Sequence, residues 1–581
     1  MTETTPDAVA ADAPDGGVGS GDEVASEGEA TSGSQSSGIV ERLRAVDPTT
    51  WIFAVAVVAT VPLVLFHYGR HQWFLRDEWF LLTDNSGFPP LLEPSAGAHW
   101  VAIPRLIYRA LWSVWGVTTY RPYAIANLLL HLLMVVMLRE LMRRSGINRW
   151  LATAAAIPML LFGPGQEGLL LAFQVGFTGS MAWGLLQLVL ADLGEDRIQR
   201  RDYLALGAGL LAITSSGIGV TTTFLVALAL LIRRGWRSAA FHSVPLGIIY
   251  TAWMKLEHVQ TAPLGRPSLS QVYEWDKWAV KSTFLGLGYF KIIAIAYIAL
   301  IVVAAILVIG PWRDRTWPEL RKELGIPVAM AVTVLFFATT SSLGRWYIGP
   351  KGAGASRYVY LQAACLLPLL AASAQIISRR WKVLLPGFVA LFLIPVPFNT
   401  RQFGHSFFNE NYYSYRRRVL TTAVRMPFAT EVPPDVRPVP DPFDGPGLTI
   451  GFLLQAEREG RLNPSTNELS LWEIAEFKVR LGFAQDIEPP GEIQWGECKQ
   501  ARSVVITPEK GQSYAINKAV DVQFVGRGKN GKGRPASPPV RFQADGLNPL
   551  HMTATLPDLR LRIKPADGKG KVAVCPTEPA K

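Results

Sequence analysis

The sequence predicts a polytopic α-helical membrane protein with a C-terminal, mostly β domain. Three observations predict this fold class. Of the 581 residues, 49% are hydrophobic and only 18% are charged, whereas soluble domains carry about 25% charged residues. Apolar runs, many of them near the length of about 20 residues that crosses a bilayer, recur between residues 50 and 399. Short runs of alternating apolar and polar residues then follow from Ser503 onward, as in β-strands.

The N-terminal segment, residues 1–40, contains eight acidic residues and no Lys or Arg. It is also rich in Gly, Ser and Ala, so it cannot bury a core, and we expect a disordered cytoplasmic tail. The segment lacks the basic and apolar regions of a cleaved signal peptide. The apolar run at 50–68 is therefore expected to be a retained first span.

We expect a transmembrane domain over residues 41–400 with about eleven helices. The stretch 203–232 could form one long helix, but dividing it at Thr214–Gly219 brings all the basic loops of the spans to one side, which the positive-inside rule makes cytoplasmic. The net charge of +11 then follows membrane topology, and we expect no nucleic-acid partner. The expected spans are 50–68, 122–142, 150–164, 168–191, 203–215, 217–232, 238–256, 286–310, 325–342, 357–377 and 382–399.

The loop after the first span lies outside the cytoplasm in this topology, and it contains the charged triplet Arg76-Asp77-Glu78 between aromatic residues. One interpretation is a solvated turn. The other is a reaction centre, because carboxylates beside aromatic, weakly polar surface can have raised pKa values that suit a general base. The following segment, His99–Val117, has apolar residues at helical spacing and is expected to form an amphipathic helix lying in the membrane interface.

Further candidate residues are expected at the same outer level. Glu167 lies at the outer end of the third span, where an acidic residue is costly unless it has a partner or a task. The Gly-rich outer loop Ser341–Gln362 carries Arg345, Lys351 and Arg357, against the positive-inside trend. Basic residues at this depth suit a phosphate or pyrophosphate; the alternative is ordinary snorkelling of basic side chains at helix ends.

The segments "RDEWF", "HWVAIPRLIYRALWSVWGV", "YRPYAIANLLLHLL" and "ASRYVYL" together resemble the GT-C superfamily of integral-membrane glycosyltransferases over about residues 50–400. The resemblance implies a sugar donor on a polyprenyl phosphate, an extracytoplasmic glycan, lipid or protein acceptor, and inversion at the sugar. It implies Asp77 as general base and Glu78 as an orienting or assisting acid. We assign the departing phosphate to Arg345, Arg357 and Lys351, and the acceptor or another part of the site to Glu167, His99 and Arg105.

No His/Asp cluster has convincing metal spacing, so we expect no obligatory metal, although some members of the superfamily use a divalent metal at the acidic pair. The absence of Walker or Rossmann signatures disfavours a nucleotide-sugar donor. Two other functions stay open: a transporter or flippase of a lipid-linked glycan, and a non-catalytic scaffold. Spans nearly free of Asp and Glu, and the lack of an internal repeat, favour chemistry at the interface over passage through the membrane.

The region after the spans is expected in two parts: an interfacial helix and Pro-rich linker at 401–447, and an exocytoplasmic α+β domain, similar to a β-sandwich, at 448–581. Helices are expected near 449–460 and 468–482, followed by six strands. Cys498 and Cys575 bracket the strands and are expected to form a disulfide outside the cytoplasm, the alternative being two free thiols. The expected location is the plasma membrane, with membrane lipids as further partners.

Overall fold

The computed structural model describes residues 47–83, 90–95, 99–192, 197–259, 265–310, 315–405, 410–440, 445–485, 493–495, 497–526, 534–535, 537–543 and 549–579. The expected disordered tail, residues 1–40, lies outside this range. The chain divides into two units, residues 1–51 and 52–581; apart from the first four residues of α2, the features described below belong to the second.

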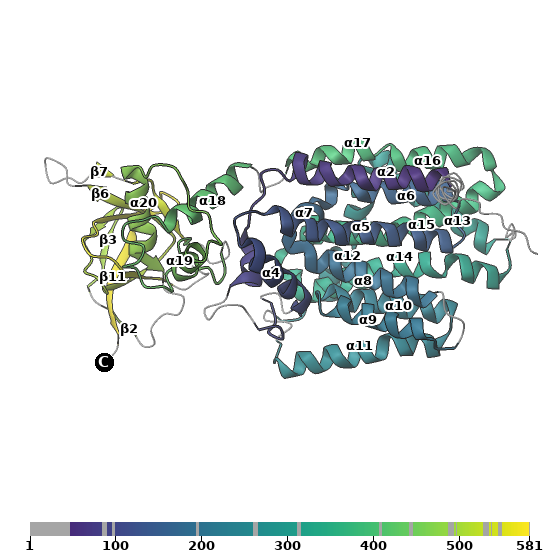
Figure 1. Cartoon of the computed structure of the whole chain (residues 1–581), viewed down its shortest axis with the longest axis horizontal. Helices are drawn as coiled ribbons and strands as arrows, with labels where there is room; N and C mark the ends of the chain where they lie inside the picture. The colour runs from purple at the N-terminus through teal and green to yellow at the C-terminus, as the bar shows by residue number, and fades with distance from the viewer. Residues whose placement is uncertain are drawn as a thin grey trace, which may run out of the picture. The chain divides into compact units, whose positions relative to one another are not determined.

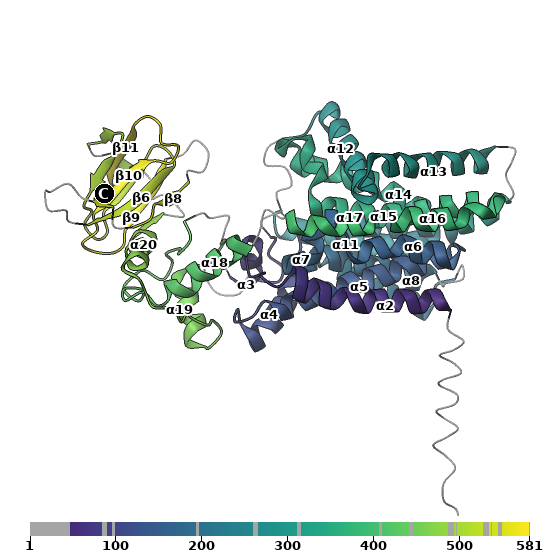
Figure 2. The ribbon, with the colours of Figure 1, turned by 90° about the horizontal axis from the view of Figure 1, so that it is seen from above.

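Residues from Pro48 to His405 form helices, and the longer ones run alongside one another as a bundle (Figures 1 and 2). The helices are α2 (Pro48–Pro62) with the turn η1 (Leu63–Tyr68), α4 (Ala102–Trp115), α5 (Arg121–Arg144), α6 (Arg149–Leu160), α7 (Gln166–Leu170), α8 (Val175–Asp192), α9 (Arg200–Ile213), α10 (Ile218–Arg233), α11 (Trp236–Leu256), α12 (Leu269–Gly288), α13 (Lys291–Ile309), α14 (Trp317–Arg345), α15 (Ser356–Arg380), α16 (Leu385–Leu393), α17 (Val396–Asn399) and η8 (Thr400–His405).

Within the described residues, seven helical segments are long and apolar enough to cross a membrane, which makes the chain a multi-pass membrane protein. They coincide with seven of the expected spans: Pro48–Tyr68, Arg121–Arg144, Ala172–Asp192, Lys291–Ile309, Trp317–Ile348, Ser356–Arg380 and Lys382–Phe403. The other four expected spans are also helical, as α6, α9, α10 and α11. Three of them have only 12, 14 and 16 residues, so the number of crossings stays a prediction.

The expected break between residues 203–215 and 217–232 is confirmed, since α9 ends at Ile213 and α10 begins at Ile218. The hydroxyls of Thr214 and Ser215 donate to carbonyls one turn back in α9, which satisfies the end of that helix. Gly219 is required at the turn, because a Cβ there would lie 2.3 Å from the Cα of Ile213. The turn also contacts the first loop: the Ile103 N–H donates to the Thr214 carbonyl over 3.1 Å.

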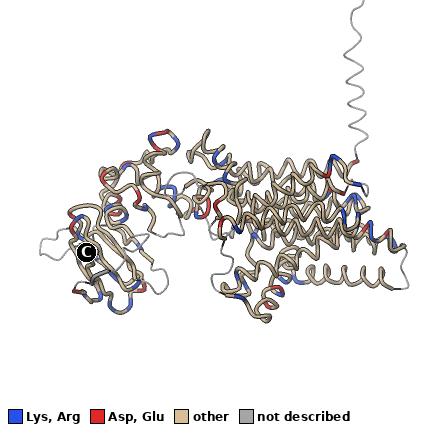
Figure 3. Tube along the Cα trace, turned by 90° about the horizontal axis from the view of Figure 1, so that it is seen from below, with Lys and Arg blue, Asp and Glu red and all other residues tan. Residues whose placement is uncertain are grey.

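Charged residues in the described part of the bundle gather toward the helix ends, and the middle stretches of the long helices are nearly free of them (Figure 3). The bundle core is apolar and packed closely through small residues. A Cβ on Gly184 of α8, for example, would lie 2.3 Å from the Thr222 side chain of α10. This arrangement places most charged side chains of the described bundle near the helix ends, where a candidate site is to be sought.

Two longer helices, α4 and α12, begin outside the expected spans. The amphipathic helix expected near His99–Val117 is present as α4. Helix α12 was not expected from the sequence. Its start is marked by Ser268, whose hydroxyl accepts the Gln271 N–H while the Gln271 side chain accepts the Ser268 N–H.

The C-terminal part contains α18 (Glu410–Ala423), α19 (Ile450–Arg458), α20 (Leu471–Gly482) and two antiparallel β-sheets (Figure 2). Both helices expected between 449 and 482 are present, as α19 and α20. One sheet has the order β1-β9-β5-β11-β2, with β3 also paired to β11; the other has β4-β10-β6-β7, with β8 also paired to β6. The strands are β1 (Phe483–Gln485), β2 (Ile493–Trp495), β3 (Lys499–Ala501), β4 (Val504–Ile506), β5 (Ser513–Ile516), β6 (Val520–Gly526), β7 (Arg534–Pro535), β8 (Val540–Phe542), β9 (Leu550–Ala554), β10 (Leu561–Pro565) and β11 (Val572–Pro579).

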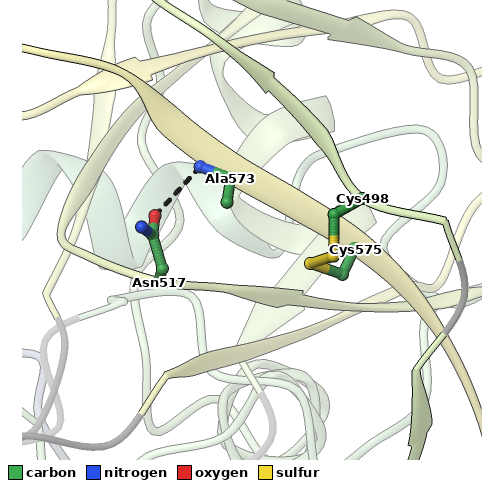
Figure 4. The surroundings of a disulfide bond; sticks show 4 residues. All are labelled: Cys498, Asn517, Ala573 and Cys575. Carbon is green, nitrogen blue, oxygen red and sulfur yellow. Dashed lines mark hydrogen bonds between the residues drawn. A yellow bond between two sulfur atoms is a disulfide. The ribbon is translucent and has the colours of Figure 1, made fainter.

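All six expected strands are found, as β4, β6, β8, β9, β10 and β11. Alternate residues of β9 and β10 are buried, as in a sheet with one face on a core. The expected disulfide is also present: Cys498 precedes β3, whose Lys499 pairs with Val574, so Cys498 comes beside Cys575 (Figure 4). In the same view Asn517 accepts the Ala573 N–H over 3.0 Å. A disulfide here is consistent with an extracytoplasmic location.

Candidate functional site

The charged triplet forms a single tight turn, η2 (Arg76–Glu78), followed by α3 (Trp79–Leu82). Glu78 closes the turn, because its Oε2 accepts the Leu75 N–H over 2.8 Å. Arg76 has φ 45°, a left-handed conformation that is unfavourable for a residue with a Cβ. The turn sends the two acidic side chains to different environments: Glu78 is buried, and Asp77 is exposed.

Glu78 is held by two tyrosines that were not among the expected site residues. Its Oε1 accepts hydrogen bonds from Tyr108 of α4, over 3.0 Å, and from Tyr120, over 2.7 Å. The Tyr120 hydroxyl in turn accepts the Ala172 N–H over 2.8 Å. Burial raises the pKa of Glu78 to about 7, although these hydrogen bonds oppose the shift. Glu78 thus ties the loop to the bundle. The orienting or assisting role that the resemblance implies for Glu78 stays a prediction.

Asp77 lies near three guanidinium groups, those of Arg357, Arg76 and Arg345. Solvent reaches part of the Asp77 side chain, but the protein around the carboxyl removes enough water to raise its pKa, and the three arginines oppose that rise. The structure therefore brings Asp77 from the first loop together with Arg345 at the end of α14 and Arg357 at the start of α15. These two arginines are sequence candidates for binding phosphate.

Arg345 and Arg357 both lie near the ring of Tyr358. Their Cζ atoms lie 5.7 and 5.4 Å from the centre of the Tyr358 ring, at cation–π distance. Tyr358 is buried, so it fixes both guanidinium groups beside the first turn of α15. A helix N-terminus with two adjacent arginines is a favourable environment for an anion.

Glu167 joins the same group through an ion pair, with its Oε2 3.5 Å from Nη1 of Arg357. The Glu167 N–H also donates to the Ser356 hydroxyl over 3.2 Å, which docks α7 on the start of α15. Glu167 therefore has the partner that its position at a span end requires, and it limits the net positive charge around Asp77.

His99 completes the group, which we call the Asp77 site: Asp77, His99, Glu167, Arg345 and Arg357. Burial, with the positive charges of Arg345 and Arg357, lowers the pKa of His99 to about 4, so the imidazole is neutral at pH 7. The ring rests against the α9–α10 turn: a Cβ on Gly217 would lie 2.6 Å from the His99 Nδ1.

Two other candidates have different surroundings. Arg105 is buried, and its Nη1 donates to the carbonyl oxygens of Pro90 and Glu93. The loop before α4 is further fixed by Trp253 of α11, whose Nε1 donates to the Leu92 carbonyl over 2.6 Å. Arg105 therefore holds the loop, which is a structural task that its charge alone did not reveal. Lys351 lies exposed in the short turn η6 (Pro350–Gly354), which packs on α12.

Sequence reasoning missed the tyrosines because a tyrosine in an aromatic-rich membrane loop is expected at the interface for its amphipathic ring alone. One general rule could have pointed to them: a carboxylate that becomes buried needs hydrogen-bond donors around it.

Within the described part of the chain, no group of three or more His, Cys, Asp and Glu side chains is placed to hold a metal ion. The Asp77 site combines a carboxylate with a raised pKa, a neutral imidazole and two fixed guanidinium groups. It can accept a proton and bind a phosphate at adjacent positions.

Comparisons of the chain with protein-family models, with curated proteins and with solved structures found no match.

Proposed function

We propose that the protein is an inverting membrane glycosyltransferase that moves a sugar from a polyprenyl-phosphate donor to a hydroxyl of an extracytoplasmic acceptor. The observation that carries this proposal is the position of Asp77 among the guanidinium groups of Arg345 and Arg357. Such a transfer needs a base for the attacking hydroxyl and positive charge for the departing phosphate. The resemblance to the GT-C superfamily, with its acidic pair in the first outer loop, points to the same chemistry.

In the proposed reaction the Asp77 carboxylate takes the proton of the acceptor hydroxyl as that oxygen bonds to the anomeric carbon. The bond from this carbon to the phosphate oxygen breaks, and the phosphate keeps the electron pair. Arg345 and Arg357 stabilise the charge on the departing polyprenyl phosphate. Glu78, which is hydrogen-bonded to Tyr108 and Tyr120, holds the turn in its conformation and so acts as a positioning residue for Asp77. A divalent metal is not required by this scheme, and its involvement stays open.

The proposal includes the eleven-span topology with the N-terminus in the cytoplasm. Asp77 and the C-terminal β region are then on the extracytoplasmic side, where polyprenyl-linked sugars and envelope acceptors meet. The disulfide between Cys498 and Cys575 supports this orientation, because disulfides persist in oxidising compartments. The C-terminal sheets would bind the acceptor, act as a spacer or dock a partner.

The second candidate function is transport of a lipid-linked glycan. A transporter typically has ionisable residues deep within its spans. Here the charges of the described bundle gather at the helix ends, which favours the enzyme. A purely structural scaffold needs far fewer spans.

The test is sugar transfer by membranes that contain the protein, supplied with radiolabelled polyprenyl-phosphate sugars and crude envelope acceptors. We expect Asp77→Asn to lower transfer by roughly 10²–10⁴-fold, the usual contribution of a positioned base. The matched control is Glu274→Gln, an exposed carboxylate of α12 that pairs only locally with Lys277. Equal transfer by the Asp77 variant and the control would reject Asp77 as base, and glycan movement across the bilayer without covalent transfer would favour the transporter.

A further inference from the structure

A separate cavity of about 200 Å³ lies where the first span ends and α5 begins. None of the residues of the Asp77 site lines it. Its walls come from η1, the residues just after it, the loop before α5, α5 itself, α7 and α18. The lining residues are Val64, Leu65, Gly69, Arg70, Gln72, Trp73, Thr118, Thr119, Tyr120, Arg121, Ala124, Leu169 and Arg417.

Three arginines from three segments face this cavity: Arg70, Arg121 and Arg417. Among the described residues that line it, none is Asp or Glu, so the cavity has a concentrated positive charge. Arg121 is the first residue of α5, where the helix dipole also favours an anion. Its Cζ lies 5.3 Å from the centre of the Phe66 ring, which holds the guanidinium at the cavity.

Arg70 is positioned by a chain of polar contacts. Its Nε donates to His71 Nε2 over 2.6 Å, so the other ring nitrogen of a neutral His71 carries the proton. That Nδ1 lies 3.1 Å from the Glu410 carboxylate and donates to it. Two acidic residues lie near the cavity without lining it. Glu410 is bound to the histidine, which lies between it and Arg70, and Glu78 is bound to the hydroxyl of Tyr120 over 2.7 Å.

The same cavity has an apolar side made by Val64, Leu65, Ala124 and Leu169. On α5, Ile125 and Leu129 follow Arg121 at intervals of four residues, so all three lie on one helix face. Ile125 and Leu129 are 41% and 62% exposed. In a membrane protein this is a cationic pocket with an apolar track running from it along a span, and it fits an amphiphile with an anionic head.

We propose that this cavity binds the phosphate head of a membrane lipid, with one hydrocarbon chain along the Arg121–Ile125–Leu129 face of α5. Guanidinium groups bind phosphate oxygens through paired hydrogen bonds, and three of them suit one phosphate better than a carboxylate. The inference does not depend on the proposed glycosyltransferase activity. The lipid could be a phospholipid or a polyprenyl phosphate, since both present a phosphate on a hydrocarbon chain.

The experiment is native mass spectrometry of the detergent-purified full chain. It is titrated separately with phosphatidylglycerol, with undecaprenyl phosphate and with dioleoylglycerol, which has no phosphate. We expect one phosphate-bearing lipid to be retained, with dioleoylglycerol bound at least tenfold more weakly. The preferred phosphate lipid identifies the natural source. Inorganic phosphate is added as a competitor, and it should displace the lipid only at far higher concentration, because it has no hydrocarbon chain.

The variant Arg121→Gln with Arg417→Gln should weaken lipid retention at least tenfold. The control is Arg418→Gln, the neighbouring residue of α18, which pairs with Glu473 over 3.2 Å and does not line the cavity. If the double variant is unstable, the single variant Arg417→Gln is used to test lipid retention, because this side chain is exposed and its replacement should not disturb the fold. Equal retention of dioleoylglycerol, retention unaffected by the arginine variants, or displacement by phosphate at lipid-like concentration would each overturn the proposal.

Discussion

Two opposing effects act on Glu78, and their balance shows what a single residue contributes to the Asp77 site. Hydrogen bonds from Leu75, Tyr108, Tyr120 and the Phe173 backbone favour the carboxylate form, yet burial outweighs them and the pKa rises to about 7. The sequence identified the acidic pair but not which member would be buried. That outcome depends on the left-handed turn at Arg76, a conformation that no propensity predicts for arginine.

The pH dependence of stability should reveal Glu78. Because its pKa is raised on folding, its neutral form is favoured in the folded state. The contribution of Glu78 to the free energy of unfolding is therefore largest below pH about 4.5, and it is lost as the pH rises to about 7. The expected loss is on the order of 3 kcal/mol. In Glu78→Gln this part of the pH dependence should vanish, whereas Glu274→Gln should keep it. Thermal unfolding of the purified protein between pH 4 and 8 checks this, and parallel profiles for all three proteins would contradict it.

Gly217 gives a second prediction at the residue scale. A Cβ there would lie 2.6 Å from His99 Nδ1, so Gly217→Ala should displace the imidazole from its present position in the Asp77 site. We expect transfer activity to fall by about tenfold or more, because small misplacements in a site have large effects on rate. Gly207→Ala in α9 is the matched control, since a Cβ there meets nothing within 4 Å. Equal activity of the two variants would show that the ring position does not matter.

At the scale of elements, the sequence was most informative where local signals were strong. The amphipathic α4, the break between α9 and α10, and helices α19 and α20 were all predicted from spacing and turn residues. Helix α12 was missed because its charged residues interrupt the apolar pattern, although the cap at Ser268 marked its start. The strands β1, β2, β3, β5 and β7, of two to four residues, were missed. Strands β4 and β8 are equally short but were expected, because each lies within a longer run of the sequence with a strand pattern.

The disulfide gives a prediction for the sheet that contains β3 and β11. It joins residues 77 positions apart, and a cross-link of this kind usually stabilises a fold by roughly 2–4 kcal/mol. We expect the Cys498→Ala, Cys575→Ala double variant to unfold its β region at lower temperature or denaturant concentration. Cys365→Ala, which removes the buried free thiol of α15, is the comparison for an unrelated cysteine. Proteolysis mapped by mass spectrometry reports on the β region, and unchanged protection there would contradict the prediction.

At the scale of the whole molecule, the Asp77 site joins residues that are far apart in the sequence. Composition and topology placed Asp77, His99, Glu167, Arg345 and Arg357 at one level of the membrane, as candidates without contacts. The sequence could not distinguish them from Arg105 and Lys351, because all carry suitable groups at similar positions. Only the packing of α4, α7, α14 and α15 decides which side chains meet. Arg105 is bound to loop carbonyls instead.

Because Arg345 of α14 lies near Asp77 of the first loop, we predict that the charge of Arg345 changes the pH dependence of the transfer activity. Deprotonated Asp77 is the proposed base, so transfer should fall at acid pH. Because the pKa of Asp77 is raised, this fall in the pH profile, called the acid limb, should occur at a pH above the ordinary pKa of an aspartate. The Arg345 guanidinium lowers the pKa of Asp77, so Arg345→Gln should move that limb to higher pH as well as slow the transfer. Arg345→Lys retains the positive charge and should leave the limb close to its original position while losing paired hydrogen bonds to phosphate. The measurement is kcat/KM as a function of pH for both variants. A slower rate with an unmoved acid limb in Arg345→Gln would mean that Arg345 serves only the donor, and that Asp77 titrates independently of α14.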